Sequence, residues 1–298
     1  NSLKELAEEF PNLVVLDADL AAATKTGIFR KAYPDRHIDC GIAEENMMGV
    51  AAGLSLVGKI PFVSSFAMFA AGRAFEQVRN SIGYPHLNVK IGATHAGITV
   101  GEDGATHQCN EDIALMRAIP NMTVLCPASF AELRAMLRRA LFEMTGPVAI
   151  RYPRGGEGAF TADTSAGDFA ELRTGKDITL CAYGTLINNV LGAAELLHED
   201  GIEARVVKLN RISPFRGGEL SRIFGTTKRL LVAEECSGVG CIGQRIAAIL
   251  AEEGHEPQRL MLCNLGRRFI EQGSVGELYR QCGLDAESLA RTAKEVCQ

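Results

Sequence analysis

The stretch Asp39–Gly53, DCGIAEENMMGVAAG, places the acidic pair Glu44 and Glu45 directly before a run of small and apolar residues. That run predicts a closely packed helix rather than one with a solvated face. Carboxylates are rarely buried without a partner, because removing one from water costs several kcal/mol. Two interpretations are open: the pair only favours a helix N-terminus by charge–dipole attraction, or one carboxylate reaches a dry functional site.

Composition places the chain among globular proteins of two domains. Its 298 residues suffice for two cores of ordinary size, and 47% apolar with 22% charged residues is neither disordered nor membrane-like. Its apolar runs are too short to span a membrane, and the N-terminal segment lacks the basic flank and apolar run of a secretion signal. We therefore predict no membrane association.

Charge and cysteine usage argue against two further classes. Lys and Arg total 31 against 36 Asp and Glu, so the net charge is −5 and no basic face for nucleic acid is evident. The nine cysteines are scattered and none forms a C-x-x-C pair, which favours free thiols over disulfides or a zinc site. We therefore predict a cytoplasmic protein that holds no metal itself.

Short β-branched runs alternate with longer helical stretches along the first half of the chain, which is typical of an α/β fold with a mostly parallel sheet. Strands are expected at residues 13–17, 36–40, 60–64, 88–92, 122–126 and 147–152. Helices are expected at residues 3–9, 43–56, 69–82, 110–117 and 131–144.

The alternation stops at residues 154–175, RGGEGAFTADTSAGDFAELRTG, which show no sustained period. It restarts with expected strands at 178–183, 204–209, 230–234 and 260–264, and with expected helices at 188–197, 243–253 and 274–282. We therefore predict two α/β domains, residues 1–165 and 176–298, joined by a linker at 166–175. Each should be a mostly parallel sheet flanked by helices.

Residues 92–108, GATHAGITVGEDGATHQ, gather polar side chains just after an expected strand. His95 and His107 bracket the pair Glu102 and Asp103 there. Ligands of open α/β sheets bind beyond the carboxyl ends of the strands, and two imidazoles with a carboxylate suit polyol binding and proton transfer. The alternatives are a capping role for His107 and a hydrogen-bonded loop position for His95.

Two aromatic residues and two arginines are weaker signals. Phe66 and Phe69 lie one helical turn apart, a spacing more often found in a core than in a ring-stacking platform. Arg151 and Arg154 lie at or just past a strand end, where a planar guanidinium suits a phosphate or, equally, a surface salt bridge.

The segment Gly238–Gly243, GVGCIG, matches the G-x-G-x-x-G pattern of dinucleotide sites. Such a site needs an acidic residue at the end of the next strand, but that strand ends in Cys263 and Asn264. We interpret the glycines as a tight strand–helix turn.

Taken together, five motifs resemble the transketolase family in order and approximate spacing: GIAEEN (41–46), SSFAMF (64–69), THAGITVGEDGATHQ (94–108), IPNMTVLCPA (119–128) and IRYPRG (150–155). The resemblance covers the family's pyrimidine-binding domain and C-terminal domain. The family's N-terminal domain binds the phosphates of thiamine diphosphate and Mg²⁺ through a G-D-G…N motif, and no GDG occurs in this sequence. The resemblance thus implies the C-terminal subunit of a split transketolase.

The resemblance further implies a reaction and partners. A thiamine-diphosphate-dependent enzyme would transfer a two-carbon ketol unit from a ketose phosphate to an aldose phosphate, as in pentose phosphate metabolism. A separate N-terminal, diphosphate-binding subunit would hold Mg²⁺. The active site would form where the two chains meet, with a homodimer of this chain inside a heterotetramer.

The same resemblance implies cofactor contacts. Glu44 matches the catalytic glutamate that hydrogen-bonds N1′ of the aminopyrimidine, a task for which an apolar surround keeps the carboxyl protonated or sharing a proton. Phe69 matches the aromatic residue that stacks on that ring, with Phe66 beside it. Asp19 and Leu20 match the loop that approaches the ring.

Substrate contacts are also implied. His95, Asp103 and His107 match residues that contact sugar hydroxyls, and the two histidines would also assist proton transfer. Arg154 matches the arginine that holds the substrate phosphate, and Arg151 is a second candidate. One departure from single-chain transketolases is an extra residue within residues 66–79.

Three alternatives remain. Half of a 1-deoxyxylulose-5-phosphate-synthase-like enzyme would share GIAE and RYPRG. The β subunit of a 2-oxoacid dehydrogenase would share the domain plan but lack the pairing of His95 with His107. A catalytically silent assembly subunit would have no need of Glu44 together with Asp103 and both histidines.

Overall fold

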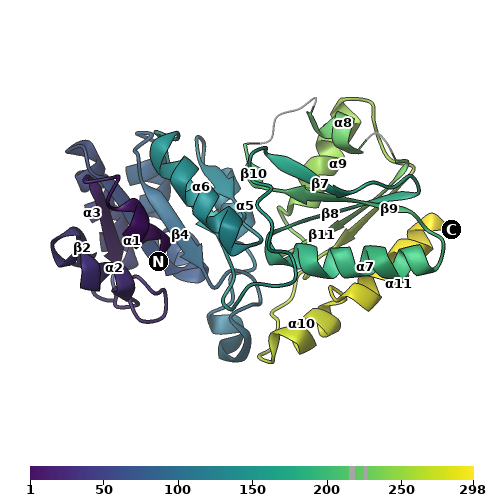
Figure 1. Ribbon diagram of the computed structural model, residues 1–298, viewed down its shortest axis with the longest axis horizontal. Coiled ribbons are helices and arrows are strands. Elements are labelled where there is room, and N and C mark those ends of the chain that lie inside the picture. The colour runs from purple at the N-terminus through teal and green to yellow at the C-terminus, as the bar shows by residue number, and fades with distance from the viewer. Residues whose placement is uncertain (215–218, 225–226) are drawn as a thin grey trace.

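The first sheet is built from the apolar runs of the N-terminal half, which can be buried on both faces. The computed structural model describes residues 1–214, 219–224 and 227–298, and the strand order is β10-β5-β6-β4-β3-β1-β2 (Figure 1). All neighbouring strands are parallel except β10, which runs antiparallel to β5. The strands are β1 (Leu13–Asp17), β2 (His37–Asp39), β3 (Ile60–Phe66), β4 (Lys90–Thr94), β5 (Thr123–Leu125), β6 (Val148–Arg151) and β10 (Arg211–Ser213).

Helices cover both faces of this sheet because successive strand residues point to opposite sides. Leu16 faces a core that contains Met47 of α3, whereas Leu13 and Val15 face a second core with Phe29 of α2. The α-helices are α1 (Ser2–Leu6), α2 (Gly27–Ala32), α3 (Glu44–Leu56), α4 (Phe75–Gln77), α5 (Asp112–Ala118) and α6 (Phe130–Phe142). The 3₁₀ turns are η1 (Pro34–Arg36) and η4 (Gly101–Thr106).

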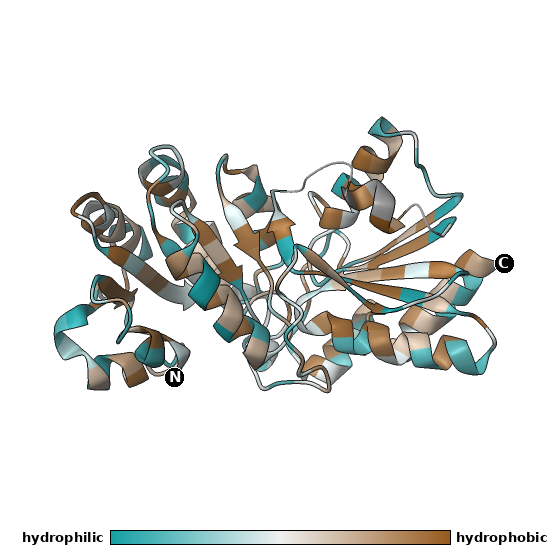
Figure 2. Ribbon diagram, turned by 45° about the horizontal axis from the view of Figure 1, so that its top comes forward, coloured by the Kyte–Doolittle hydropathy of each residue, from teal (hydrophilic) through white to brown (hydrophobic). Residues whose placement is uncertain are grey.

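The second sheet has the order β12-β11-β8-β9-β7, with only β7 antiparallel to its neighbour. Its strands are β7 (Phe169–Arg173), β8 (Ile178–Tyr183), β9 (Ala204–Leu209), β11 (Arg229–Ala233) and β12 (Arg259–Cys263). Its helices are η5 (Gly184–Leu186), α7 (Ile187–Glu199), α8 (Glu219–Phe224), α9 (Ile242–Glu252), α10 (Val275–Cys282) and α11 (Ala286–Cys297). Hydrophobic residues line the strands, while polar residues lie on the outer helix faces (Figure 2).

The predicted fold class of two mostly parallel, helix-flanked sheets is confirmed. The expected linker is wrong over Phe169–Arg173, because FAELR forms the edge strand β7 beside β9. This strand is only half-buried, so it lacks the apolar run that marks the central strands. The helices α2 and α11 and the short strand β10 were also not expected.

The expected helix at 69–82 is not a regular α-helix. It consists of the π-helix η2 (Met68–Arg73), the short α4 and the π-helix η3 (Val78–Gly83). A π-turn accommodates an extra residue without ending the helix, and such turns are frequent at functional sites. The wide turns therefore give a physical account of the extra residue in this segment.

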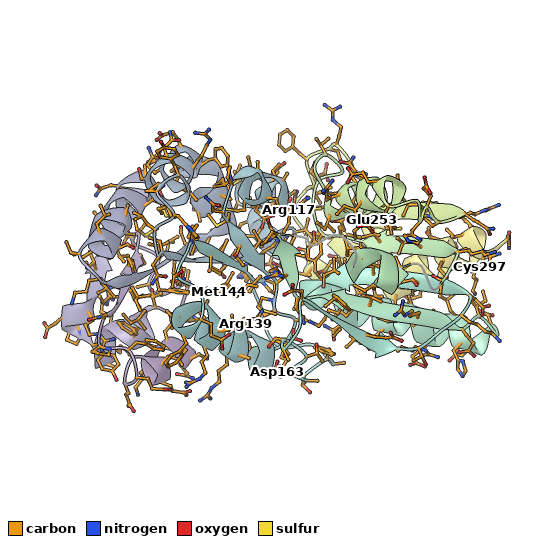
Figure 3. The ribbon with its side chains drawn as sticks, turned by 90° about the horizontal axis from the view of Figure 1, so that it is seen from above. Arg117, Arg139, Met144, Asp163, Glu253 and Cys297 are labelled. Atoms are coloured by element: carbon orange, nitrogen blue, oxygen red, sulfur yellow. The ribbon has the colours of Figure 1, made fainter. Side chains whose placement is uncertain are left out.

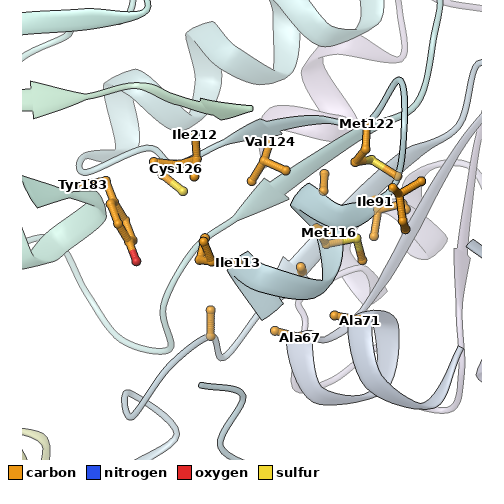
Figure 4. Close-up of a cluster of buried hydrophobic side chains, with 14 of the residues drawn as sticks. Ala67, Ala71, Ile91, Ile113, Met116, Met122, Val124, Cys126, Tyr183 and Ile212 are labelled. Atoms are coloured by element: carbon orange, nitrogen blue, oxygen red, sulfur yellow. The ribbon is translucent and has the colours of Figure 1, made fainter. Parts of the chain in front are cut away.

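The two halves of the chain share a buried junction. In Figure 4, Val124 and Cys126 of the first half lie beside Ile212 and Tyr183 of the second in one apolar cluster. Arg117, labelled in Figure 3, donates from Nη1 to the Gly240 carbonyl at 2.9 Å across this junction.

One ion pair at the junction has no access to water. Lys208 Nζ on β9 lies 2.9 Å from Glu132 Oε1 on α6, and both side chains are 0% exposed. Glu132 also accepts from the backbone N–H of Ala128 and from Thr164. Lys208 therefore neutralises a carboxylate that also holds the start of α6.

All nine cysteines lie within the described residues and are free thiols, as predicted. Within the described part of the chain, no helix combines the length and apolarity needed to cross a membrane.

We expect Lys208→Met to lower the free energy of unfolding of the free chain by about 3–5 kcal/mol, because it leaves Glu132 buried and charged without its cation. Equilibrium denaturation measures this loss. The control is Arg245→Ala, which removes an exposed pair with Glu252 and should change stability by less than about 1 kcal/mol. Equal effects of the two variants would contradict the role of the buried pair.

Candidate functional site

The loop that follows β4 carries the two predicted histidines at the carboxyl edge of the first sheet. It begins at His95, whose backbone φ of 56° turns the chain sharply out of the strand. The N–H of Gly97 donates to the carbonyl of Cys109 at 2.9 Å, so the two ends of the segment 97–109 are hydrogen-bonded to each other. The loop therefore has a defined shape even though it is rich in glycine.

Four aromatic rings meet beside this loop. Phe66 ends β3 opposite Thr94 of β4, and the ring of His95 stacks on Phe66 with centroids 3.8 Å apart. Phe69 of η2 lies 6.0 Å from Phe66, and His107 presents its ring edge to Phe69 at 5.7 Å. The structure therefore brings together both predicted histidines and both predicted aromatic residues.

Each histidine is oriented by the threonine that precedes it. Thr94 Oγ1 lies 3.0 Å from His95 Nδ1, and Thr106 Oγ1 lies 2.9 Å from His107 Nδ1. Among the described residues, Nε2 of each ring has no hydrogen-bonding partner. These threonines were not predicted from the sequence, although the repeated Thr-His dipeptide was the available signal.

His95 is a neutral imidazole near pH 7. Burial, together with a smaller effect of the positive charge of Arg154, lowers its pKa to about 4, and Asp103 partly opposes this shift. A neutral ring can accept a proton or a hydrogen bond at its free nitrogen.

A cavity of about 1200 Å³ opens beside these rings. Its lining contains four of the predicted site residues: Phe66, His95, Asp103 and Arg154. The N-terminal segment 1–5 and the loop 23–26 also line this cavity.

Arg154 is placed as an available cation at this cavity. Its backbone N–H donates to Thr99 Oγ1 at 3.1 Å, and its Nη1 donates to the carbonyl of Val100 at 2.8 Å. The same Nη1 lies 3.8 Å from Asp103 Oδ2, and the side chain is about half exposed. This position suits the recognition of an anionic group.

The prediction that Arg151 contacts a substrate phosphate is wrong for this structure. Arg151 is only 7% exposed, and its Nε donates to Asp112 Oδ2 at 2.7 Å. Its Nη2 donates to the backbone carbonyl of Glu235 at 2.9 Å. Because β-strand residues alternate in direction, Arg151 on β6 turns into the domain junction rather than toward the cavity.

Glu44 and Glu45 have different environments at the start of α3. Glu44 is 1% exposed, whereas Glu45 is exposed to solvent. Met47 and Met48 are buried below Glu44 as expected. Only one carboxylate of the pair therefore enters the interior.

The surround of Glu44 is not only apolar, because it also contains the guanidinium of Arg73. Arg73 Nη1 donates to Glu44 Oε2 at 2.7 Å, and its guanidinium carbon lies 4.5 Å from the ring centroid of Phe69. The Arg73 side chain is 41% exposed, so it lies between the buried carboxylate and solvent. Arg73 was not predicted from the sequence, although it follows Phe69 by four residues in a helical segment.

Asp19 and Leu20 lie in a hydrogen-bonded turn after β1. The N–H of Asp19 donates to Asp39 Oδ1 at 3.0 Å, and the N–H of Leu20 donates to Asp17 Oδ1 at 3.3 Å. Within the described residues, neither is part of the cavity lining. Thr26 Oγ1 donates to Asp17 Oδ2, so this nearby hydroxyl is already engaged.

The GVGCIG segment is a strand–helix turn. The N–H groups of Ile242 and Gly243 at the start of α9 donate to the carboxylate of Glu234 at 2.7 and 2.8 Å. A dinucleotide diphosphate would need those same amides. This arrangement supports our interpretation of the motif.

Within residues 1–214, 219–224 and 227–298, no cluster of three or more His, Cys, Asp or Glu side chains is placed to hold a metal ion.

Family comparison matches both halves of the chain. Residues 1–156 match the family described as transketolase, pyrimidine binding domain, and residues 167–289 match transketolase, C-terminal domain.

Similar proteins include chains of nearly the same length. A Methanocaldococcus jannaschii protein described as a transketolase C-terminal section is 43% identical, over 99% of this chain and 93% of its own. The 6-deoxy-6-sulfo-D-fructose transketolase subunit of Clostridium sp. is 39% identical, over 99% and 92%. The inactive β4 tetramer of a split gene transketolase superposes with a TM-score of 0.89 and 44% identity, over 99% and 95%.

We expect His95 to remain neutral down to about pH 4. The imidazole ¹³Cε1 shifts of the six histidines report this directly, and His95→Gln identifies the resonance. Because the folded pKa lies below the ordinary 6.5, the unfolded chain binds the proton first, and the stabilising effect of a neutral His95 is lost as pH falls from 6.5 toward 4. A titration midpoint near 6.5 in the folded chain would contradict the buried, neutral assignment.

Proposed function

The chain belongs to the transketolase family, and on that basis we propose that it is the C-terminal subunit of a split transketolase. It would act with a separate N-terminal subunit that holds the cofactor diphosphate and Mg²⁺. The observation that carries the proposal is the meeting of the rings of Phe66, Phe69, His95 and His107. The buried carboxylate of Glu44 is linked to this cluster through Arg73, which contacts both Glu44 and Phe69.

The proposed reaction is ketol transfer from a ketose phosphate to an aldose phosphate. Thiamine diphosphate, when bound, supplies the nucleophilic carbon that carries the two-carbon unit. The chain's own side chains would hold and orient the sugar. Arg154 would hold the substrate phosphate, and Asp103 would accept from sugar hydroxyls.

The residues near Glu44 fit the pyrimidine end of this cofactor. Glu44 offers a buried carboxyl to a ring nitrogen, and Phe69 offers an aromatic face beside it. Arg73 contacts both of these groups in the free chain, so its partly exposed side chain must turn outward when the ring binds. Asp19 and Leu20, in the turn after β1, stay candidates for contact with the same ring.

The histidines would move protons at the substrate. His95 is neutral near pH 7 and has a free Nε2, so it can accept a hydrogen bond from a sugar hydroxyl and orient that proton for transfer. His107 is held in the same way by Thr106 and reaches the cluster from the other end of the loop.

The proposed assembly is a homodimer of this chain within a heterotetramer in the cytoplasm. The outer side of α3 carries Gly49 and Gly53, where an added Cβ would meet no atom of this chain. Another subunit could therefore approach the helix that begins at Glu44 closely. The related split gene transketolase structure is an inactive β4 tetramer, which supports a need for the partner chain.

A second candidate function is supported by one comparison. The 1-deoxy-D-xylulose-5-phosphate synthase of Chlorobium luteolum is 34% identical over 99% of this chain, although the match spans only 47% of that enzyme. Pyruvate as donor would indicate this activity, and a ketose phosphate as donor would indicate transketolase.

Reconstitution of the chain with its diphosphate-binding partner, thiamine diphosphate and Mg²⁺ should give ketose-phosphate-dependent release of an aldose phosphate. Glu44→Ala should lower kcat by about 100-fold or more, because proton positioning at the cofactor ring is lost. Glu45→Ala, an exposed neighbour on the same helix turn, should keep the wild-type rate. Full activity of Glu44→Ala would refute its role, and an inactive wild-type complex would favour a silent subunit.

Arg73→Met should destabilise the free chain by about 1–3 kcal/mol, because Glu44 is left buried without its charged partner. The same variant should bind thiamine diphosphate in the reconstituted complex at least as tightly as wild type, since the ring no longer competes with a guanidinium. Denaturation and calorimetric titration measure the two effects. Arg79→Ala, an exposed arginine of the same segment, is the control, and weaker cofactor binding by Arg73→Met would show that Arg73 instead helps to hold the ring.

A further inference from the structure

The carboxylate of Glu235 reaches from the second domain into the loop that carries the histidines. Its Oε1 accepts from the N–H of Ile98 at 2.7 Å and from the N–H of Thr99 at 3.2 Å. Its Oε2 accepts from the hydroxyl of Tyr279 on α10 at 3.0 Å. We infer that Glu235 is a positioning residue for the loop that carries His95, Asp103 and His107.

The contact is transmitted to Arg154 through Thr99. The Thr99 hydroxyl donates to the carbonyl of Ala96 at 2.8 Å and accepts from the N–H of Arg154 at 3.1 Å. Because Glu235 fixes the backbone of Thr99, it also fixes the point from which Arg154 enters the cavity. One carboxylate therefore helps to position both the loop that carries the histidines and the Arg154 backbone that is bonded to it.

The fit is close on the loop side. Gly97 has a φ of 63°, and a Cβ at this position would overlap Glu235 Oε1. Gly97 also closes the loop by its bond to Cys109. Because Gly97 has no Cβ, the carboxylate of Glu235 can lie directly against it, at the position whose bond to Cys109 closes the loop.

The backbone of Glu235 is itself fixed by hydrogen bonds at the domain junction. Its backbone carbonyl accepts from Arg151, which is paired with Asp112 at the base of α5. The N–H of Ser237 donates to the carbonyl of Asn110 just past the loop. The domain junction thus determines where the Glu235 carboxylate points. Arg151 acts on the cavity only indirectly, by holding the backbone of Glu235.

The neighbouring Glu234 provides a matched comparison. Both carboxylates are buried just after β11, but Glu234 accepts from the first amides of α9, whereas Glu235 accepts from the loop amides. A general loss of stability should follow from either change. A change confined to the loop should follow only from changes at Glu235.

The first experiment is amide hydrogen exchange of the complete free chain, which needs neither partner nor cofactor. Glu235→Ala should speed exchange at Ile98 and Thr99 at least 10-fold, because their acceptor is removed. Glu235→Gln keeps an acceptor oxygen of the same shape and should restore most of the protection. Glu234→Ala should act on the first turn of α9 instead.

If Glu235→Ala does not fold, Tyr279→Phe removes only one hydrogen bond from the carboxylate and should speed loop exchange to a smaller extent. Unchanged exchange at Ile98 and Thr99 in every folded variant of Glu235 and Tyr279 would overturn the inference.

The second experiment rests on the proposed function. In the reconstituted enzyme, Glu235→Ala should lower kcat at least 10-fold and raise KM for the sugar phosphate, with recovery in Glu235→Gln. Faster loop exchange with unchanged kcat and KM would overturn the positioning role. An inactive wild-type complex would count against the proposed function, while the exchange experiment would still decide the contact between Glu235 and the loop.

Discussion

A carboxylate cannot be taken out of water without a partner, and this requirement organises the molecule. The structure meets it in a different way for each of four buried glutamates. Glu44 is paired with Arg73, Glu132 with Lys208, Glu234 with helix amides, and Glu235 with loop amides. The contacts of Glu132 and Glu235 lie at the domain junction. The burial of these two charges and the docking of the domains therefore depend on each other.

The candidate site is an outcome of that docking. Its rings come from β3, from η2 and from the loop after β4, all of them in the first domain. Yet the loop backbone is hydrogen-bonded by Glu235 of the second domain. The second domain contributes no side chain to the ring cluster, but its Glu235 holds the loop that carries two of the rings. This gives a physical reason for the two domains to occur in one chain.

Much of the fold could be predicted because central strands carry their own signal. Residues 13–17, 178–183 and 204–209 form strands with the expected bounds, since each is a mainly apolar run that is almost entirely buried. β7 and β10 lie at sheet edges, so they need fewer apolar residues and have no comparable signal. The π-helices escaped prediction because each is only six residues long, too short for its wider period to be told from that of an α-helix.

The chemical groups of the site are specified by the amino-acid sequence alone, in which Glu44, Phe66, Phe69, His95 and His107 follow one another in a recognisable order. Which of these groups face one another depends on the tertiary fold. It turns Arg151 away from the cavity, sets Arg73 against Glu44, and joins Glu235 to a loop more than a hundred residues earlier. The reason is that side-chain direction and long-range pairing depend on how the two sheets pack, which no local pattern records.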